Sequence, residues 1–178
     1  MNMRSDTILI DNKGNGFDNA IKETAKAAEY CGLEKKDALY LQLCTEEILS
    51  LARSVTGEMQ ASFWLENEGK QYTLHMSTKA VLDKEKRSLL IASSTTGRNE
   101  AAKTFLGQIR DSFERAMAAD ADHSNMIPEM VMSDVSACPD DSDGWDWYER
   151  SILKKVSDQV KITIRGKTVE LTVVKTFV

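Results

Sequence analysis

The sequence predicts an α+β fold, a two-layer α/β sandwich in which helices cover one face of a mixed, mostly antiparallel sheet. Apolar and polar residues alternate in two pairs of short segments, and a tight polar turn joins each pair, as in β-hairpins. Elsewhere, apolar residues recur at the spacing of amphipathic helices. Hairpins cannot supply the parallel crossovers of a Rossmann-type sheet. The 178 residues suit one domain over the whole sequence.

The first part of the chain is expected to hold a strand, two helices and a hairpin. Gly14 and Gly16 form a GxG sequence after the strand, but the third glycine and the Lys-Ser/Thr pair of a phosphate-binding loop are missing. We therefore interpret them as a turn that leads into the first helix. The expected elements are a strand at 7–10, helices at 17–32 and 34–55, and strands at 61–66 and 72–76.

The second part is expected to hold three helices and a closing hairpin. Asp83 has the residue type and position of an N-cap for a short helix that ends near Ile91. A run of hydroxyl residues and a glycine at 93–97 breaks this helix, and a longer amphipathic helix follows to about Met117. The remaining expected elements are a helix at 145–157 and strands at 160–164 and 169–173.

Residues 116–149 differ from the rest of the chain in charge. They hold nine of the 28 acidic residues and both prolines, but no Lys or Arg. We interpret about 120–144 as a solvated loop inserted into the domain, with a lid over a neighbouring pocket as the alternative. The formal charge of −5 is thus an average, because the other residues carry 23 basic and 19 acidic side chains. They include no basic stripe or binding motif, so nucleic-acid binding is not expected.

The composition predicts a cytoplasmic protein. The N-terminal residues contain no apolar run of signal-peptide length, and no stretch approaches the ~18 consecutive apolar residues of a membrane span. Cys31, Cys44 and Cys138 lack CxxC spacing and are expected to be reduced thiols. His75 and His123 have no partner at metal-ligand spacing, so no metal site is expected. The three tryptophans are expected to pack in the fold or to lie in a surface patch.

Two segments and the order of the elements carry a resemblance to a known superfamily. Residues 41–52 read Leu-Gln-Leu-Cys-Thr-Glu-Glu-Ile-Leu-Ser-Leu-Ala, and residues 151–177 form the expected final helix and hairpin. Together with the hairpin at 59–78, they resemble the GHKL superfamily of histidine kinase-like ATPases. The greatest similarity is to the small bacterial anti-sigma factor serine kinases. The resemblance covers most of the chain and implies the histidine kinase-like ATPase fold.

The resemblance assigns a role to one glutamate of the second helix. In this family the helix glutamate acts as a base or orients water, and an asparagine four residues later completes the octahedral shell of Mg²⁺. Here Glu47 is followed by Leu51 at that spacing, and in the alternative register Glu46 is followed by Ser50. Leucine cannot ligate Mg²⁺, and serine is a weak, short substitute. Glu47 is therefore the candidate catalytic residue, without a complete metal site.

The other nucleotide-binding positions implied by the resemblance are also altered. An aspartate that accepts a hydrogen bond from adenine would fall at Ser77, and Lys79 stands where a glycine is expected. The polar segment 93–103 lies in the family's lid region and opens a helix, so it could hold a phosphate or an acidic side chain; a plain N-cap is the alternative. The positions implied to line the nucleotide are Ser50, Leu51, Ser77, Lys79, Arg98, Asn99 and Lys103.

These altered motifs favour a regulatory protein over an enzyme. Micromolar ATP binding needs about −8 kcal/mol, and losing a buried carboxylate and a metal ligand costs ~1–3 kcal/mol each. We expect a degenerate ATPase-fold protein of anti-sigma type without efficient ATP hydrolysis, which binds a sigma factor or an antagonist protein; a homodimer is left open. The alternative is an ATP-binding anti-sigma-type serine kinase that uses Mg²⁺, Glu47 and the 93–103 segment. A small-ligand pocket without nucleotide specificity is a third hypothesis.

Overall fold

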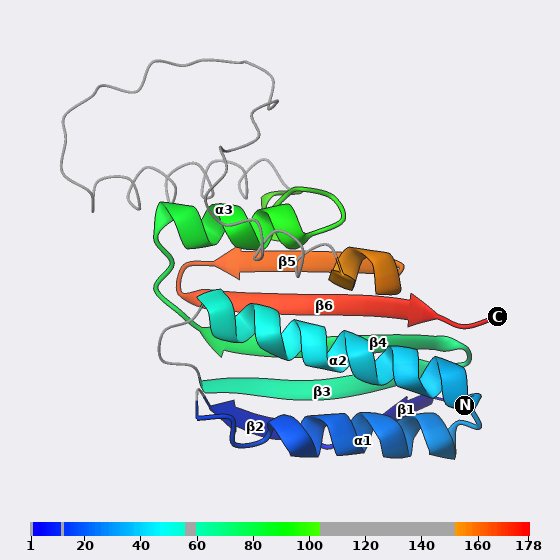
Figure 1. Cartoon of the computed structure of the whole chain (residues 1–178). Helices are drawn as coiled ribbons and strands as arrows, with labels where there is room; N and C mark the ends of the chain where they lie inside the picture. The colour runs from blue at the N-terminus through cyan, green and yellow to red at the C-terminus, as the bar shows by residue number, and fades with distance from the viewer. Residues whose placement is uncertain (1, 12, 56–59, 104–151) are drawn as a thin grey trace, which may run out of the picture.

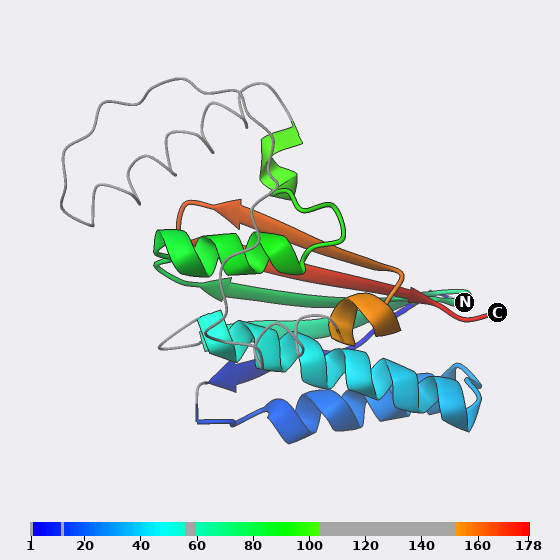
Figure 2. The same cartoon turned by 45° about the horizontal axis from the view of Figure 1, so that its top comes forward.

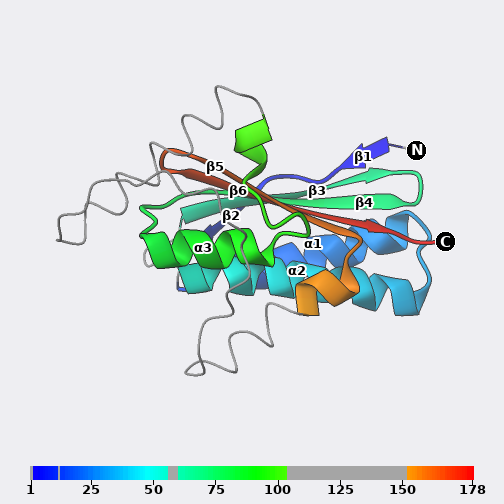
Figure 3. The same ribbon diagram turned by 90° about the horizontal axis from the view of Figure 1, so that it is seen from above.

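The computed structural model describes residues 2–11, 13–55, 60–103 and 152–178. The strands are β1 (Asn2–Arg4), β2 (Ile8–Asp11), β3 (Gln60–Glu68), β4 (Gln71–Lys79), β5 (Gln159–Arg165) and β6 (Thr168–Thr176). The helices are α1 (Phe17–Tyr30), α2 (Lys35–Val55), α3 (Lys84–Ser93) and the 3-10 helix η1 (Glu100–Lys103), with residues 152–156 also helical. They form a two-layer α+β sandwich with α1, α2 and α3 on one face of the sheet (Figures 1 and 3). The expected fold class is confirmed.

The two predicted hairpins lie side by side in one six-stranded sheet. The strand order is β1-β3-β4-β6-β5, and β2 also pairs with β3. Every ladder between the described strands is antiparallel. The β4–β6 ladder joins the hairpins and places Leu74 opposite Val173 and Met76 opposite Leu171.

Buried and half-buried residues alternate along the strands, so one face of the sheet is covered by the helices and the other is open. In β3 and β4 every second residue is buried, and the residues between them are half-buried. The buried set packs against α1, α2 and α3 in one hydrophobic core, as the alternation in the sequence predicts. The largest fully buried side chains are Tyr72, Phe63, Leu41, Ile48, Leu49, Leu65, Leu74, Met76, Leu90, Leu153 and Ile162.

The N-terminal edge of the sheet contains a strand that the sequence does not reveal. β1 and β2 both pair with β3, and β1 places Arg4 opposite Glu66. Between them, the Ser5 amide donates to the Leu65 carbonyl at 2.9 Å, and the Leu65 amide donates to the Ser5 hydroxyl at 2.9 Å. A side chain thus replaces a backbone acceptor where the edge changes from β1 to β2. Three residues with one large apolar side chain carry too little periodicity to predict β1.

The expected turn between β2 and α1 is confirmed. The Asp11 carboxylate accepts hydrogen bonds from the backbone amides of Lys13 at 2.9 Å and Asn15 at 3.0 Å. Gly16, directly before α1, has a φ of 89°, and a Cβ there would lie 2.2 Å from the Leu9 carbonyl oxygen. The glycine therefore serves close backbone packing rather than phosphate binding.

The helices are fixed by one predicted cap and one unpredicted polar contact. Asp83 accepts a hydrogen bond from the Lys86 amide at 2.7 Å and caps α3, as predicted. Helices α1 and α2 pack side by side, and the buried hydroxyls of Thr24 and Thr45 meet between them at 3.0 Å. The helical residues 152–156 lie beside α2, where the Cys44 thiol approaches the Val156 carbonyl at 3.8 Å (Figure 2).

Several expectations fall outside the described residues. These are the helix expected after Lys103, most of the helix at 145–157, and the choice between loop and lid for 120–144. None of the helices among the described residues has the length and apolarity needed to cross a bilayer.

Candidate functional site

The candidate residues of α2 lie on different sides of the helix. Glu47 is half-buried, Ser50 is exposed, and Leu51 is buried in the hydrophobic core. Successive residues of a helix point about 100° apart. The pair Glu47/Leu51 and the alternative pair Glu46/Ser50 therefore have different surroundings. In the Glu47 register, the position four residues later is a core leucine rather than a ligand that faces a pocket.

The end of β4 places the predicted strand residues on the open face of the sheet. Met76 and Thr78 face the helix layer and are buried, so Ser77 and Lys79 point to the opposite face. The structure therefore does not bring Ser77 and Lys79 to the face that α2 covers. Thr78 is the polar residue at this end of β4 on the helix side, and its hydroxyl donates to the Gln60 carbonyl at 3.0 Å. A shift of one residue in an inferred alignment is enough to move a side chain through the sheet.

The hydroxyl-rich segment after α3 covers the outer edge of β5. The Thr95 amide and hydroxyl both donate to the Val160 carbonyl, at 2.9 and 3.1 Å. The Ser93 and Ser94 hydroxyls donate to carbonyls of α3 itself. Figure 3 shows the chain passing from α3 on the helix side to η1 on the open side of the sheet.

Asn99 completes this edge. It is 2% exposed; its Oδ1 accepts from the Ile164 amide at 2.8 Å, and its Nδ2 donates to the Ile164 carbonyl at 3.0 Å. With a further bridge between Asn99 and Ile162, the segment covers β5 at three alternate residues. Free strand edges invite pairing with other chains, so this polar segment protects the sheet. In the described structure Asn99 therefore serves the sheet edge.

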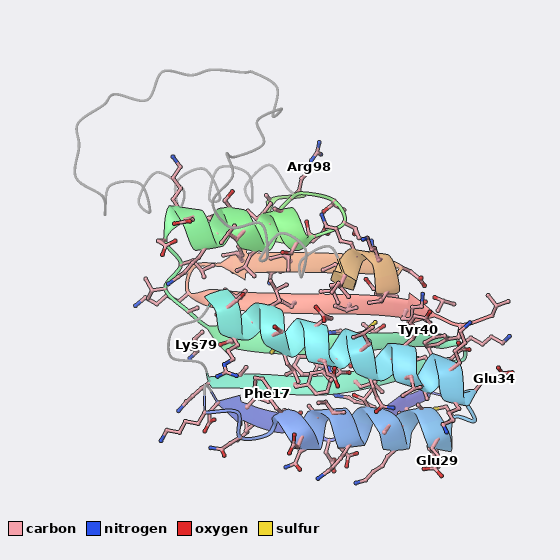
Figure 4. All side chains as sticks on the ribbon, viewed as in Figure 1. Phe17, Glu29, Glu34, Tyr40, Lys79 and Arg98 are labelled. Atoms are coloured by element: carbon pink, nitrogen blue, oxygen red, sulfur yellow. The ribbon has the colours of Figure 1, made fainter. Side chains whose placement is uncertain are left out.

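Of the two basic residues of the same segment, Arg98 does not lie near α2, the helix that carries Glu47 (Figure 4). Arg98 is exposed, and Figure 4 shows it pointing away from the sheet and from α2. Lys103 is the last residue of η1, and its side chain lies outside the description. The positions nominated from the sequence thus lie on α2, on the open sheet face and beyond β5, rather than around one centre.

The open face carries a cluster of four side chains from three neighbouring strands, which we call the Trp64 cluster: Arg4, Trp64, Glu66 and His75. The Trp64 and His75 rings stack with centroids 4.9 Å apart and an angle of 7° between their planes. The Arg4 guanidinium carbon lies 5.2 Å from the Trp64 ring centroid. Because β1 and β4 flank β3 on opposite sides, Arg4 and His75 cover opposite faces of the indole.

Glu66 holds the Trp64 cluster together. Its Oε1 accepts from Trp64 Nε1 at 3.2 Å and lies 3.7 Å from Arg4, while Oε2 lies 3.4 Å from His75 Nε2. Burial lowers the pKa of His75 below its ordinary value, although the Glu66 carboxylate opposes that shift. Sequence reasoning treats these residues separately, because only the strand register reveals that Trp64 lies opposite His75.

The structure describes two of the three cysteines, Cys31 and Cys44, both as free thiols. Burial raises the pKa of Cys44 to about 12, so its thiol is protonated at neutral pH. Cys31, also a free thiol, donates to Asn67 Oδ1 at 3.5 Å. Among the described residues no three His, Cys, Asp or Glu side chains are grouped as metal ligands would be.

Three of the six large apolar side chains that the described structure exposes lie on the pair of helices α1 and α2. Tyr30, at the end of α1, is 63% exposed, and on α2 Leu39 and Tyr40 are 58% and 41% exposed. Leu43 is half-buried and lies one turn from Leu39 and Tyr40 on the same helix. This outer surface of α2, formed by Leu39, Tyr40 and Leu43, is separate from the stripe that α2 buries in the core.

Comparison with known proteins assigns no family. No protein-family model matches the chain, and no curated protein matches its sequence.

Proposed function

We propose that this protein is a regulatory, protein-binding domain on a histidine kinase-like ATPase scaffold, without efficient ATP hydrolysis. The observation that carries the proposal is at the end of β4, where neither alignment supplies a carboxylate. Ser77 and Lys79 lie on the sheet face opposite α2, and Thr78, on the helix side, donates its hydroxyl to the Gln60 carbonyl. A nucleotide site needs the adenine contact and the residues at the phosphates on one side of the sheet.

The surroundings of Leu51 support the same proposal. Its side chain has no donor atom for Mg²⁺, and it is buried in the core. Losing one metal ligand and one adenine acceptor costs ~1–3 kcal/mol each, which weakens binding by roughly 10²–10⁴-fold. Catalysis suffers more than binding, because phosphoryl transfer depends on Mg²⁺ placed at the phosphates.

The outer surface of α2 supports a protein partner. Leu39 and Tyr40 expose apolar area outside the core of the described structure, and aromatic residues are enriched at protein interfaces. By its resemblance to anti-sigma factors, the expected partner is a sigma factor or a small antagonist protein. The proposed interface is the α2 surface around Leu39, Tyr40 and Leu43.

Calorimetry tests the absence of a working nucleotide site. Titration of the whole protein with Mg-ATP, and separately with Mg-ADP, is expected to give no heat at micromolar protein. A site tighter than about 100 µM would overturn the proposal in favour of the serine kinase. In that event, the Glu47→Gln variant is expected to bind nucleotide but to transfer no phosphoryl group to the antagonist.

Binding to purified partners tests the interface. Sigma factors and antagonist proteins of the source organism are titrated against the wild type and the Leu39→Ser/Tyr40→Ser double variant, and binding is expected to the wild type only. Val81→Ser is the matched control, because Val81 is also an exposed apolar residue, at 76%. It stands two residues after Lys79, which lies at the other end of the molecule from Tyr40 (Figure 4). Equal binding by both variants would exclude this surface, and no binding to either partner class would exclude the anti-sigma role.

A further inference from the structure

Strand β1 is held to the sheet by a short ladder, by Met3, which packs against the hydrophobic core, and by one side-chain clamp on the open face. It has three residues, which pair with Asn67 and its two neighbours in β3. On the open face, the Arg4 side chain reaches both the Glu66 carboxylate, at 3.7 Å, and the Trp64 ring, at 5.2 Å. Loss of these two contacts would leave β1 with its backbone hydrogen bonds and with the packing of the half-buried Met3 against the core.

The clamp depends on how one carboxylate is shared. Glu66 Oε1 faces Arg4 and Trp64, whereas Oε2 faces His75. His75 Nε2 is shielded from solvent and forms no hydrogen bond with the described residues, so the 3.4 Å approach to Glu66 is an electrostatic contact of poor hydrogen-bond geometry. Because β1 and β4 flank β3 on opposite sides, a shift of the carboxylate toward His75 is a shift away from Arg4.

The charges that face His75 come from four strands. Glu66 on β3 and Glu170 on β6 favour the imidazolium, and Arg4 on β1 disfavours it. Lys161 on β5 lies in the same row across the sheet, because both it and His75 lie opposite Thr172. The His75 side chain is only 22% exposed, and its burial is the largest influence on its protonation.

We propose that the Trp64 cluster is a proton-sensitive clamp on β1, closed while His75 is neutral and released when the imidazole takes up a proton from solvent. The imidazolium draws the Glu66 carboxylate toward β4 and places a second cation against the indole that Arg4 covers. Arg4 then loses its carboxylate partner, and β1 opens from β3 in a larger fraction of molecules.

The direction of the pH effect follows from linkage. Because burial lowers the pKa of His75 in the clamped state, the open state binds the proton more tightly. The clamped state is therefore fully favoured above the ordinary histidine value of about 6.5, and it loses this advantage as the pH falls through the lowered pKa of His75. Acid opens the clamp.

Amide hydrogen exchange of the full chain by NMR, corrected for the intrinsic effect of pH, tests this clamp. The Ser5 and Leu65 amides bond across the β1–β3 edge, and their protection is expected to fall several-fold between pH 7.5 and pH 5.5. The Met76 amide in central β4 is the internal reference and is expected to keep its protection. The imidazole resonances of His75 are expected to titrate below pH 6.5.

His75→Phe is the decisive variant, because it keeps a ring to stack on Trp64 but has no titrating group. It is expected to retain the Ser5 and Leu65 protection at both pH values. Arg4→Gln is expected to lower that protection already at pH 7.5 and to remove most of its pH dependence. A drop in protection that persists in His75→Phe, a wild type without a drop, or a His75 that titrates above pH 6.5 would each overturn the proposal.

Discussion

The side chain of Asn99 makes the pair of hydrogen bonds with Ile164 that a neighbouring strand would make. One bond runs from the Ile164 amide to Oδ1 at 2.8 Å, and the other from Nδ2 to the Ile164 carbonyl at 3.0 Å. A primary amide has the same donor and acceptor groups as a peptide unit, so one side chain can cap a strand edge. This contact explains why a polar residue is buried at the border of the sheet.

Asn99→Ala is expected to lower the free energy of unfolding by about 2–3 kcal/mol, because both backbone groups of Ile164 lose their partner. The uncovered β5 edge is also expected to promote self-association. Urea unfolding measures the first effect and light scattering the second. Thr96→Ala, which removes only an exposed hydrogen bond to Glu100, is the control, and an equal loss in both variants would contradict this role.

Gly16→Ala is expected to destabilise the fold far more than Gly14→Ala, although both glycines have a positive φ, 89° and 87°. At Gly16 a Cβ would collide with the Leu9 carbonyl, whereas at Gly14 no atom lies within 4 Å. We expect Gly16→Ala to lower the free energy of unfolding by about 3 kcal/mol or more and Gly14→Ala by about 1–2 kcal/mol, measured by thermal or urea unfolding. Similar losses would mean that the loop simply moves away from β2.

The buried hydroxyls of Thr24 and Thr45 are expected to be coupled. Each also lies near a carbonyl of its own helix, Ala20 at 2.8 Å and Leu41 at 3.2 Å, so the two hydroxyls share their hydrogen atoms. Each Thr→Val change is expected to cost about 1–2 kcal/mol, and the double variant less than the sum by at least about 0.5 kcal/mol. Strict additivity in the double-mutant cycle would show that the contact between the helices contributes nothing.

Asp158 is expected to contribute stability that acid removes. Desolvation opposes its ionisation, but hydrogen bonds from the Thr176 amide at 2.6 Å and from Lys175 at 3.1 Å outweigh it, so its pKa is lowered. The contribution is complete above the ordinary value near 3.8 and disappears as the pH falls through the lowered pKa.

Asp158 is well exposed, so solvent screening limits its effect to below about 1 kcal/mol. Urea unfolding at pH 7 is expected to find Asp158→Asn less stable than the wild type. At a pH well below the ordinary aspartate value, the two proteins are expected to unfold at the same urea concentration. A constant difference at both pH values would assign the effect to packing instead.

Periodicity in the sequence was enough to predict the helices and hairpins that the structure describes. Leu74 and Met76 alternate with polar residues, and Ile48 and Leu51 follow helical spacing, so local pattern and burial agree. The Asp83 cap and the turn at Gly16 were predictable from residue type, since each depends on residues that are close in the sequence.

Contacts across strands were not predictable in this way. The stack of Trp64 on His75 depends on the register of β3 against β4, and the Arg4 contact depends on β1, whose three residues show no pattern. The sheet face assigned to Ser77 changes if the inferred alignment of β4 with the family's strand shifts by one residue. In the sequence, Asn99 is one polar residue within a polar loop. Its burial is explained only by its contact with β5, 65 residues away.

The position of β6 has a consequence for how the chain folds during synthesis. β6 is the last strand along the chain, yet it lies between β4 and β5 in the sheet. The β3–β4 hairpin therefore emerges from the ribosome long before the strand that covers the other edge of β4. Ladders with such large sequence separation form slowly, and an early unpaired edge is prone to aggregate. Chaperone demand is thus expected to be greatest for nascent chains that stop short of Thr168.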